Sequence, residues 1–162
     1  MSADTPQMSK NSIIEETVRY YRGRPDRFGR DSKGECVYRA SETQMCAVGR
    51  CVNWEGIPSD ELESRVKFSG AATHFLSRFG DGMLHDRYRG HTTSFWDSLQ
   101  RLHDNENYWN LSAELSLEGY RYLIETFPDF NPGILAFGSI ETEKYETAKV
   151  LVRLNRQPAS ST

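Results

Sequence analysis

Apolar residues recur at helical spacing in several stretches, and polar segments rich in glycine and proline separate them. The first predicted helix covers residues 12–22, where Ile14, Val18 and Tyr21 share one face and Ser12 opens an S-x-x-E capping box. Residues 80–93 contain three glycines and many polar groups, which predicts a mobile loop. The remaining predicted helices lie at residues 59–68, 70–79, 94–103, 111–127 and around 145–152, although the K-V-L-V-R-L run there also fits a strand.

Two short segments depart from the helical pattern. Residues 36–40 and 45–52 are rich in valine, tyrosine and cysteine, and the polar stretch S-E-T-Q lies between them. This arrangement predicts an antiparallel β-hairpin, whose open edges invite strand addition or dimerisation. The predicted fold class is therefore α+β, with one small hairpin covered by four to five helices.

Length and composition indicate one globular domain over residues 11–155, with flexible tails at 1–10 and 156–162. The chain has 162 residues, and no apolar run is long enough for a membrane span or a secretory signal. Three cysteines cannot all pair within one chain, so a reducing compartment is expected. We therefore expect a cytoplasmic protein.

Charge is unevenly distributed along the chain. Residues 19–39 contain seven basic and three acidic residues, a difference of +4, whereas residues 104–147 contain nine acids and two bases, a difference of -7. The basic segment could grip a small anionic, nucleotide-like ligand or an acidic protein, or its arginines could pair with the acidic half. An isoelectric point near 5.8 makes sequence-specific nucleic-acid binding unlikely. The candidate contact residues are Arg22, Arg24, Arg27, Arg30 and Arg39.

Two tryptophans are further candidates for a contact surface. Trp96 lies one step off the apolar face of its predicted helix, and Trp54 lies in residues 53–56, which look like an insertion. An exposed tryptophan beside arginines is typical of an interface hot spot. Packing in the core is the structural alternative for both.

Three short motifs together resemble a family of small, largely uncharacterised bacterial and phage proteins. They are C-V-Y-R at 36–39, C-A-V-G at 46–49 and L-Q-R-L-H-D at 99–104, with I-P-S-D-E at 57–61 beside them. The resemblance implies a hairpin from the first two motifs and a helix for the third. It also implies a cytoplasmic, possibly phage-encoded accessory protein, for which binding and disabling a host component is the expected role. Residues 53–56 depart from this pattern, and 128–162 have no counterpart in it.

The same motifs contain the residue types of a cysteine hydrolase. Cys46 would be the nucleophile, His103 its base and Asp104 the acid that orients the imidazole. Neighbours on a helix point about 100° apart, so Asp104 can orient His103 only if the helix ends there. Because no complete catalytic signature is present, the leading hypothesis is a non-enzymatic binding protein, and a hydrolase using Cys46 and His103 is the alternative.

No metal or cofactor is predicted. Cys36, Cys46 and Cys51 have the spacing C-x9-C-x4-C, which matches no common zinc site. In the predicted hairpin, Cys36 and Cys46 would also lie too far apart to share one ion. The chain contains no phosphate-binding loop and no zinc-protease or serine-hydrolase motif.

Overall fold

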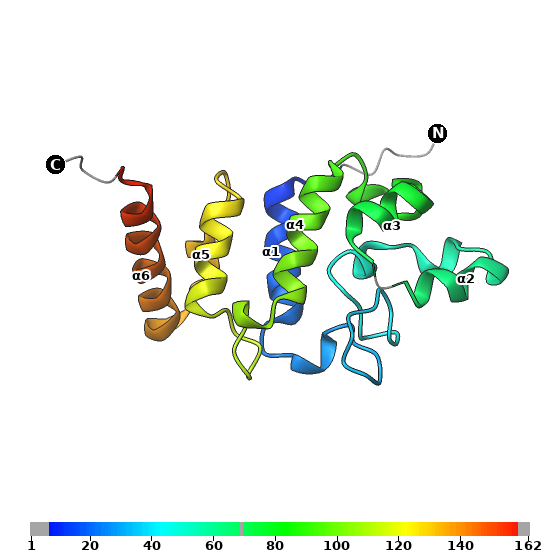
Figure 1. Cartoon of the computed structure of the whole chain (residues 1–162), viewed down its shortest axis with the longest axis horizontal. Coiled ribbons are helices and arrows are strands. Elements are labelled where there is room, and N and C mark those ends of the chain that lie inside the picture. The colour runs from blue at the N-terminus through cyan, green and yellow to red at the C-terminus, as the bar shows by residue number, and fades with distance from the viewer. Residues whose placement is uncertain (1–6, 69, 159–162) are drawn as a thin grey trace.

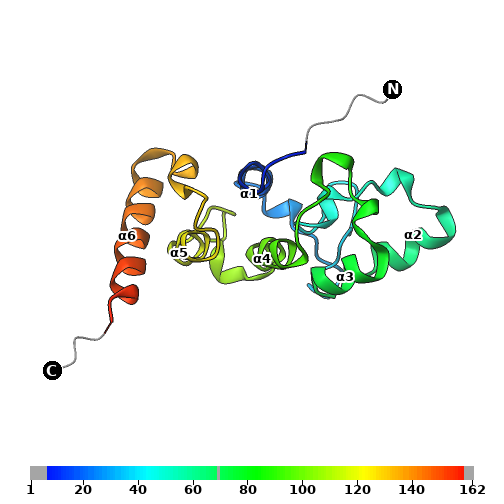
Figure 2. The same cartoon turned by 90° about the horizontal axis from the view of Figure 1, so that it is seen from above.

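In the computed structural model, which describes residues 7–68 and 70–158, helices joined by loops and 3-10 turns follow one another along the long axis (Figure 1). Helix α6 forms one end, α5 lies next to it, α1 and α4 occupy the middle, and α3 and α2 form the other end (Figures 1 and 2). The helices are α1 (Lys10–Tyr21), α2 (Ser59–Val66), α3 (Ala72–Phe79), α4 (Thr93–Asp104), α5 (Leu117–Thr126) and α6 (Gly138–Arg156).

Helix α1 confirms the predicted apolar face and corrects the predicted start. Ile14, Val18 and Tyr21 are all buried in the core. The helix begins earlier than the capping box suggested, because the hydroxyl of Ser9 accepts a hydrogen bond from the backbone N–H of Ser12 at 3.1 Å.

Helix α4 is capped in the same way by Thr92, and not by Ser94 as the pattern suggested. The Thr92 hydroxyl accepts from the backbone N–H of Phe95 at 3.3 Å. The buried face of α4 includes Trp96, Leu99 and His103, so this helix is the central element of the core.

The remaining helices agree with the pattern in type, with shifted ends. The predicted 111–127 helix shortens to α5, and the ambiguous K-V-L-V-R-L run belongs to the helix α6. Residues 80–93 are more ordered than predicted, since they form two 3-10 turns and bury Met83, Leu84 and Tyr88. One connected core runs from α1 through α4 and α5 to Ala148 of α6.

The predicted β-hairpin is wrong, and the fold is all-α. In the described residues, 36–40 and 45–52 form no strand; a single antiparallel bridge joins Arg39 to Met45, and residues 49–51 form a 3-10 turn. Buried residues follow one another without alternation in V-Y at 37–38 and C-A-V-G at 46–49. A half-exposed hairpin would alternate buried and exposed side chains, so these segments are wrapped into the core as loops.

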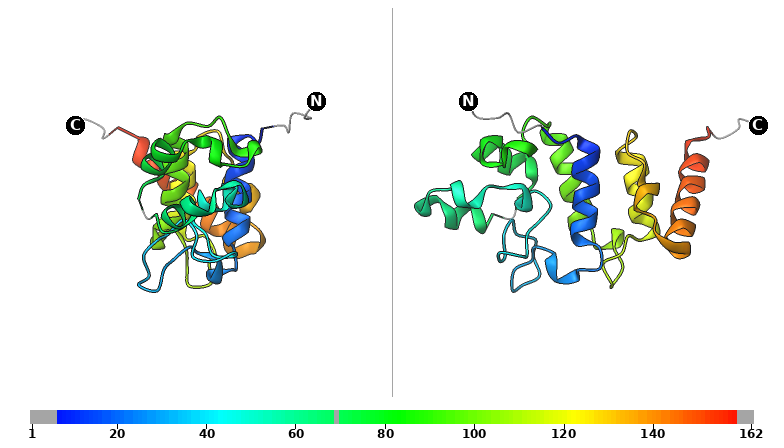
Figure 3. Two further views of the ribbon diagram at one scale, coloured as in Figure 1. Left: turned by 90° about the vertical axis from the view of Figure 1, so that its right-hand side faces the viewer. Right: turned by 180° about the vertical axis from the view of Figure 1, so that it is seen from behind.

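The backbone N–H groups of these loops donate hydrogen bonds to acceptors that do not belong to a β-sheet. The N–H of Val48 donates to the side chain of Gln100 in α4 at 3.2 Å, and the N–H of Val37 donates to the carbonyl of Gly29 at 3.0 Å. Gly29 and Gly49 let these backbones approach each other, because a Cβ atom at either position would collide with a neighbouring main chain. Figure 3 shows the loops that connect α1 to α2 gathered beside α1 and α4, on the side of α2.

The tails were predicted at residues 1–10 and 156–162, and residues 1–6 and 159–162 lie outside the described part of the chain. Within it, the backbone of Met8 donates to the carbonyl of Arg87 at 2.8 Å, and α1 already begins at Lys10. No helix among the described residues combines the length and the apolar character needed to cross a membrane.

Candidate functional site

The last turn of α4 brings a histidine and a carboxylate together against the loop that follows α1. His103 is fully buried, and its Nδ1 lies 2.7 Å from Oδ1 of Asp104. On the other side of the ring, Nε2 accepts a hydrogen bond from the backbone N–H of Gly29 at 3.3 Å. The ring also stacks on Phe28, with 5.1 Å between ring centres. These contacts fasten the end of α4 to residues 28–29.

The two hydrogen bonds determine where the imidazole carries its proton. A backbone N–H can only donate, so Nε2 of His103 holds the lone pair and Nδ1 holds the proton, which it donates to Asp104. Burial lowers the pKa of His103, although the Asp104 carboxylate acts in the opposite direction, so the ring is neutral at pH 7. Both ring nitrogens are therefore occupied, and neither is free to take a proton from a thiol.

Asp104 extends this network to Gln100. The Gln100 amide donates to Oδ1 of Asp104 at 2.8 Å and accepts from the backbone N–H of Val48 at 3.2 Å. Burial alone would raise the pKa of Asp104, but hydrogen bonds from His103, Cys36 and Gln100 outweigh it and hold that pKa below its ordinary value. The motif L-Q-R-L-H-D thus supplies three side chains to one network that ties α4 to the preceding loops. We call Gln100, His103 and Asp104 the histidine cluster.

The thiol beside His103 and Asp104 belongs to Cys36 and not to Cys46. Cys46 is fully buried, its Sγ accepts from the backbone N–H of Gly49 at 3.2 Å, and burial raises its pKa well above the ordinary value. Burial and the Asp104 carboxylate raise the pKa of the half-buried Cys36 to about 11. Neither thiol is ionised at neutral pH, so these contacts do not support Cys46 as a nucleophile with His103 as its base.

In the described residues, one group of possible metal ligands lies close together. The ligating atoms of Cys36, His103 and Asp104 are all within 4.8 Å of one another. A metal at Nδ1 of His103 would move the ring proton to Nε2, where it would face the N–H of Gly29, and two donors cannot bond. With the ring in this position, the group of Cys36, His103 and Asp104 does not fit a metal ion.

Of the five candidate arginines, Arg22 and Arg24 lie beside carboxylates and Arg27 is bound to the backbone. Arg22 lies 3.1 Å from a carboxylate oxygen of Glu114, without the geometry of a hydrogen bond, and Arg24 lies 2.8 Å from a carboxylate oxygen of Asp26. Arg27 donates to a backbone carbonyl of α1 at 3.0 Å. Arg22 thus pairs with the acidic half as the alternative expected, whereas Arg24 and Arg27 have partners near to them in sequence.

Arg30 and Arg39 lie in a different environment. Together with Lys67, which follows α2, they line a surface cleft of about 760 Å³ that we call the cationic cleft. Among the described residues, neither arginine has a carboxylate within ion-pair distance, and Arg30 donates only to the carbonyl of Gly34 at 3.1 Å. The one acid in the lining, Asp31, accepts from two backbone N–H groups of its own turn at 2.8 and 2.9 Å. Lys67 pairs with Glu63 of α2, so the positive charge of the lining that has no carboxylate partner among the described residues comes from Arg30 and Arg39.

Both candidate tryptophans are buried, which corrects the expectation that one of them is exposed. Trp96 has no exposed surface and belongs to the core, whereas Trp54 is 9% exposed and donates to the carbonyl of Gly49 at 2.8 Å. The guanidinium of Arg39 lies 5.5 Å from the centre of the Trp54 ring, so Trp54 makes a cation–π contact with an arginine of the cationic cleft.

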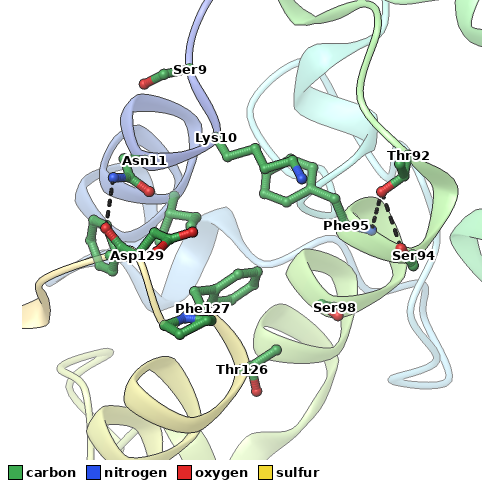
Figure 4. Close-up of a pocket in the computed structure, with 13 residues that line it drawn as sticks. Ser9, Lys10, Asn11, Thr92, Ser94, Phe95, Ser98, Thr126, Phe127 and Asp129 are labelled. Carbon is green, nitrogen blue, oxygen red and sulfur yellow. Dashed lines mark hydrogen bonds between the residues drawn. The ribbon is translucent and has the colours of Figure 1, made fainter.

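A second cavity of about 460 Å³ lies between the first turns of α1 and α4 and the chain after α5 (Figure 4). Its apolar walls include Phe95 and Phe127. The Lys10 ammonium lies 5.8 Å from the centre of the Phe95 ring, and Asp129 brings the opposite charge to the same cavity. The two charges cancel, so this cavity favours an anion less than the cationic cleft does.

Lys67 is the residue of the cationic cleft that the sequence pattern missed. A lysine at the end of a predicted helix is ordinarily solvated, and no local signal places it near Arg30 or Arg39. It reaches them because the backbone N–H of Tyr38 donates to the carbonyl of Phe68 at 3.2 Å, which holds the end of α2 against residues 37–40.

Comparison of the chain with protein-family models, with curated proteins and with solved structures found no match.

Proposed function

We propose that this protein is a non-enzymatic binding protein that takes a small anionic ligand in the cationic cleft. The observation that carries the proposal is the convergence of Arg30, Arg39 and Lys67 from three segments, with no carboxylate partner for either arginine among the described residues. A guanidinium presents paired N–H donors that match a phosphate or a carboxylate. A volume of about 760 Å³ also lies within the usual range for small-molecule sites.

The lining favours a compact anion over a nucleic-acid strand. Single-stranded nucleic acids are held by exposed aromatic rings on which bases stack. The cleft is lined by no aromatic residue in the described part of the chain, and the Trp54 ring lies under the guanidinium of Arg39. Val37 and Val66 supply the apolar part of the wall. The ligand class is therefore a small molecule rich in phosphate or carboxylate groups.

The biological setting of this proposal rests on the motifs at 36–39, 46–49 and 99–104. Their resemblance to bacterial and phage proteins supports an accessory protein that acts in the host cytoplasm. There it would sequester an anionic metabolite, or hold an acidic segment of a host protein in the same cleft and so modulate that protein. Capture from host lysate, with mass spectrometry of bound proteins and small molecules, separates these two outcomes.

Calorimetric titration of the full chain tests the ligand class. The probes are inorganic phosphate, pyrophosphate, adenosine monophosphate and citrate, each at low and at high salt. At least one probe is expected to bind more weakly at high salt, because ions screen the attraction. The double variant Arg30→Ala/Arg39→Ala should weaken that binding about a hundredfold, since each lost charge-assisted hydrogen bond costs about tenfold or more.

Arg24→Ala is the matched control, because it removes the same side chain from an exposed position that does not line the cleft. It should bind the probe like the unmodified protein. Equal binding by the double variant, or no binding of any probe at low salt, would overturn the proposal.

A further inference from the structure

Helix α6 exposes apolar side chains on a face that is not covered by α5. Ala148 and Val152 are buried, whereas Ile140, Val150 and Leu154 are 70%, 52% and 57% exposed. The helix forms one end of the molecule, so nothing else in the described chain lies beyond it (Figures 1 and 2). An exposed apolar row on a helix of this length is typical of a protein contact.

The exposed positions have the spacing of a helix-pairing face. Ile140, Glu143, Thr147, Val150 and Leu154 follow one another at i, i+3, i+7, i+10 and i+14, and all five are exposed, so this face carries one carboxylate in its first half. This is the heptad spacing that keeps side chains on one side of a helix. Thr147 lies at the middle of the row, where a small side chain allows a second helix to approach.

Charge divides α6 into two halves. The half up to Thr147 carries three acids and one base, and the second half carries three bases and no acid. Two of the acids are used within the helix, where Glu141 pairs with Lys144 at 2.7 Å and Glu146 with Lys149 at 3.1 Å. Among the described residues, the exposed side chains left without an ion-pair partner are Glu143 in the first half and Arg153 and Arg156 in the second.

We infer that the exposed face of α6 binds the same face of a second copy of this chain, with the two helices antiparallel. Antiparallel pairing brings the acidic half of each helix against the basic half of the other, and two-fold symmetry repeats this contact. Parallel pairing would place like charges together, which is unfavourable. A helix of 19 residues is about 28 Å long, so one helix pair makes a small interface and the dimer depends on protein concentration.

Sedimentation velocity of the full chain over two decades of concentration tests this inference. The average mass should rise from that of a monomer towards that of a dimer. Glu143→Arg and Arg153→Glu should each raise the dimer dissociation constant about tenfold, because each replaces two attractive contacts by two repulsive ones. An equal mixture of these two variants should associate like the unmodified protein, since every contact between the two different copies is attractive again.

Two further variants separate this contact from general effects of charge and folding. Val150→Asp should abolish association, because it removes an apolar side chain from the row and adds a carboxylate to the half that faces Glu143 of the other copy. Glu55→Arg makes the same charge change as Glu143→Arg at an exposed turn away from α6, and it should associate normally. Thermal unfolding confirms that each variant is folded. A monomer at every concentration, or a dimer dissociation constant that is unchanged by the charge reversals at 143 and 153, would overturn the inference.

Discussion

The histidine cluster of α4 binds the loops that also line the cationic cleft, but the two regions use their polar groups in opposite ways. In the cluster, both nitrogens of His103 and both polar atoms of the Gln100 amide have partners inside the protein. In the cleft, Arg30 and Arg39 have no carboxylate partner among the described residues. Satisfied buried groups hold a fold together, whereas unsatisfied charges at a surface are available to a ligand.

The comparison shows that residue types alone do not locate function. Cysteine, histidine and aspartate in shared motifs suggested a catalytic centre, yet the buried histidine uses both nitrogens to connect α4 to a loop. Arginines in a polar loop suggested a solvated surface as readily as a site. Changes in the cluster should therefore reduce stability, and changes in the cleft should reduce binding.

The largest effect on stability is expected for His103→Leu. Leucine fills the space of the ring but leaves the buried N–H of Gly29 and the Asp104 carboxylate without their partner. We expect a loss of about 2–4 kcal/mol in the free energy of unfolding, measured by urea denaturation. Arg101→Ala, on the exposed side of the same helix, should change it by less than about 0.5 kcal/mol. Equal effects of the two substitutions would contradict a structural role for the cluster.

The cluster should also make the protein sensitive to acid. Burial lowers the pKa of His103 in the folded state, so the unfolded chain takes up a proton first as the pH falls below about 6.5. The free energy of unfolding should then decrease by up to about 1.4 kcal/mol for each pH unit below that value. The lowered pKa of Asp104 acts in the same direction at more acidic pH. Urea denaturation between pH 7 and pH 5 should show this decrease, and His103→Leu should lack it.

Thiol labelling distinguishes the cluster from a catalytic centre. With a pKa of about 11, Cys36 should react with iodoacetamide at neutral pH about a hundredfold more slowly than free cysteine. Cys46 and Cys51 are fully buried and should react only after unfolding. Mass spectrometry of peptides from native and urea-unfolded protein measures all three. Fast labelling of native Cys46 that disappears in a His103 variant would restore the hydrolase hypothesis.

The smallest effects on stability are expected in the cationic cleft. Arg30→Ala and Arg39→Ala should each change the free energy of unfolding by less than about 0.5 kcal/mol, because neither arginine gives up an ion pair. Arg22→Ala serves as the comparison, since Arg22 pairs with Glu114 and should cost about 0.5–1 kcal/mol. A loss above 2 kcal/mol for Arg39 would show that its contact with Trp54 serves the fold instead of a ligand.

The sequence by itself determined where most helices lie and which sides they bury. Ile14, Val18 and Tyr21 were placed on one buried face from their spacing alone, and the apolar stripe of α4 likewise. Helices can be predicted in this way because their hydrogen bonds join residues four apart, so the pattern and the structure have the same local range. Capping was less predictable, since Ser9 and Thr92 compete with neighbouring hydroxyls for the same role.

Tertiary structure alone decided the conformation of residues 36–52 and the composition of both sites. These residues have the composition of strands, but their backbone groups bond to Gln100 and Phe68, which lie far away in sequence. The proton on His103 is positioned by Gly29, 74 residues earlier, and Lys67 enters the cationic cleft only because α2 folds back onto residues 37–40. Contacts between residues so distant leave no periodic signal in the chain, because they depend on how the helices pack and not on local spacing.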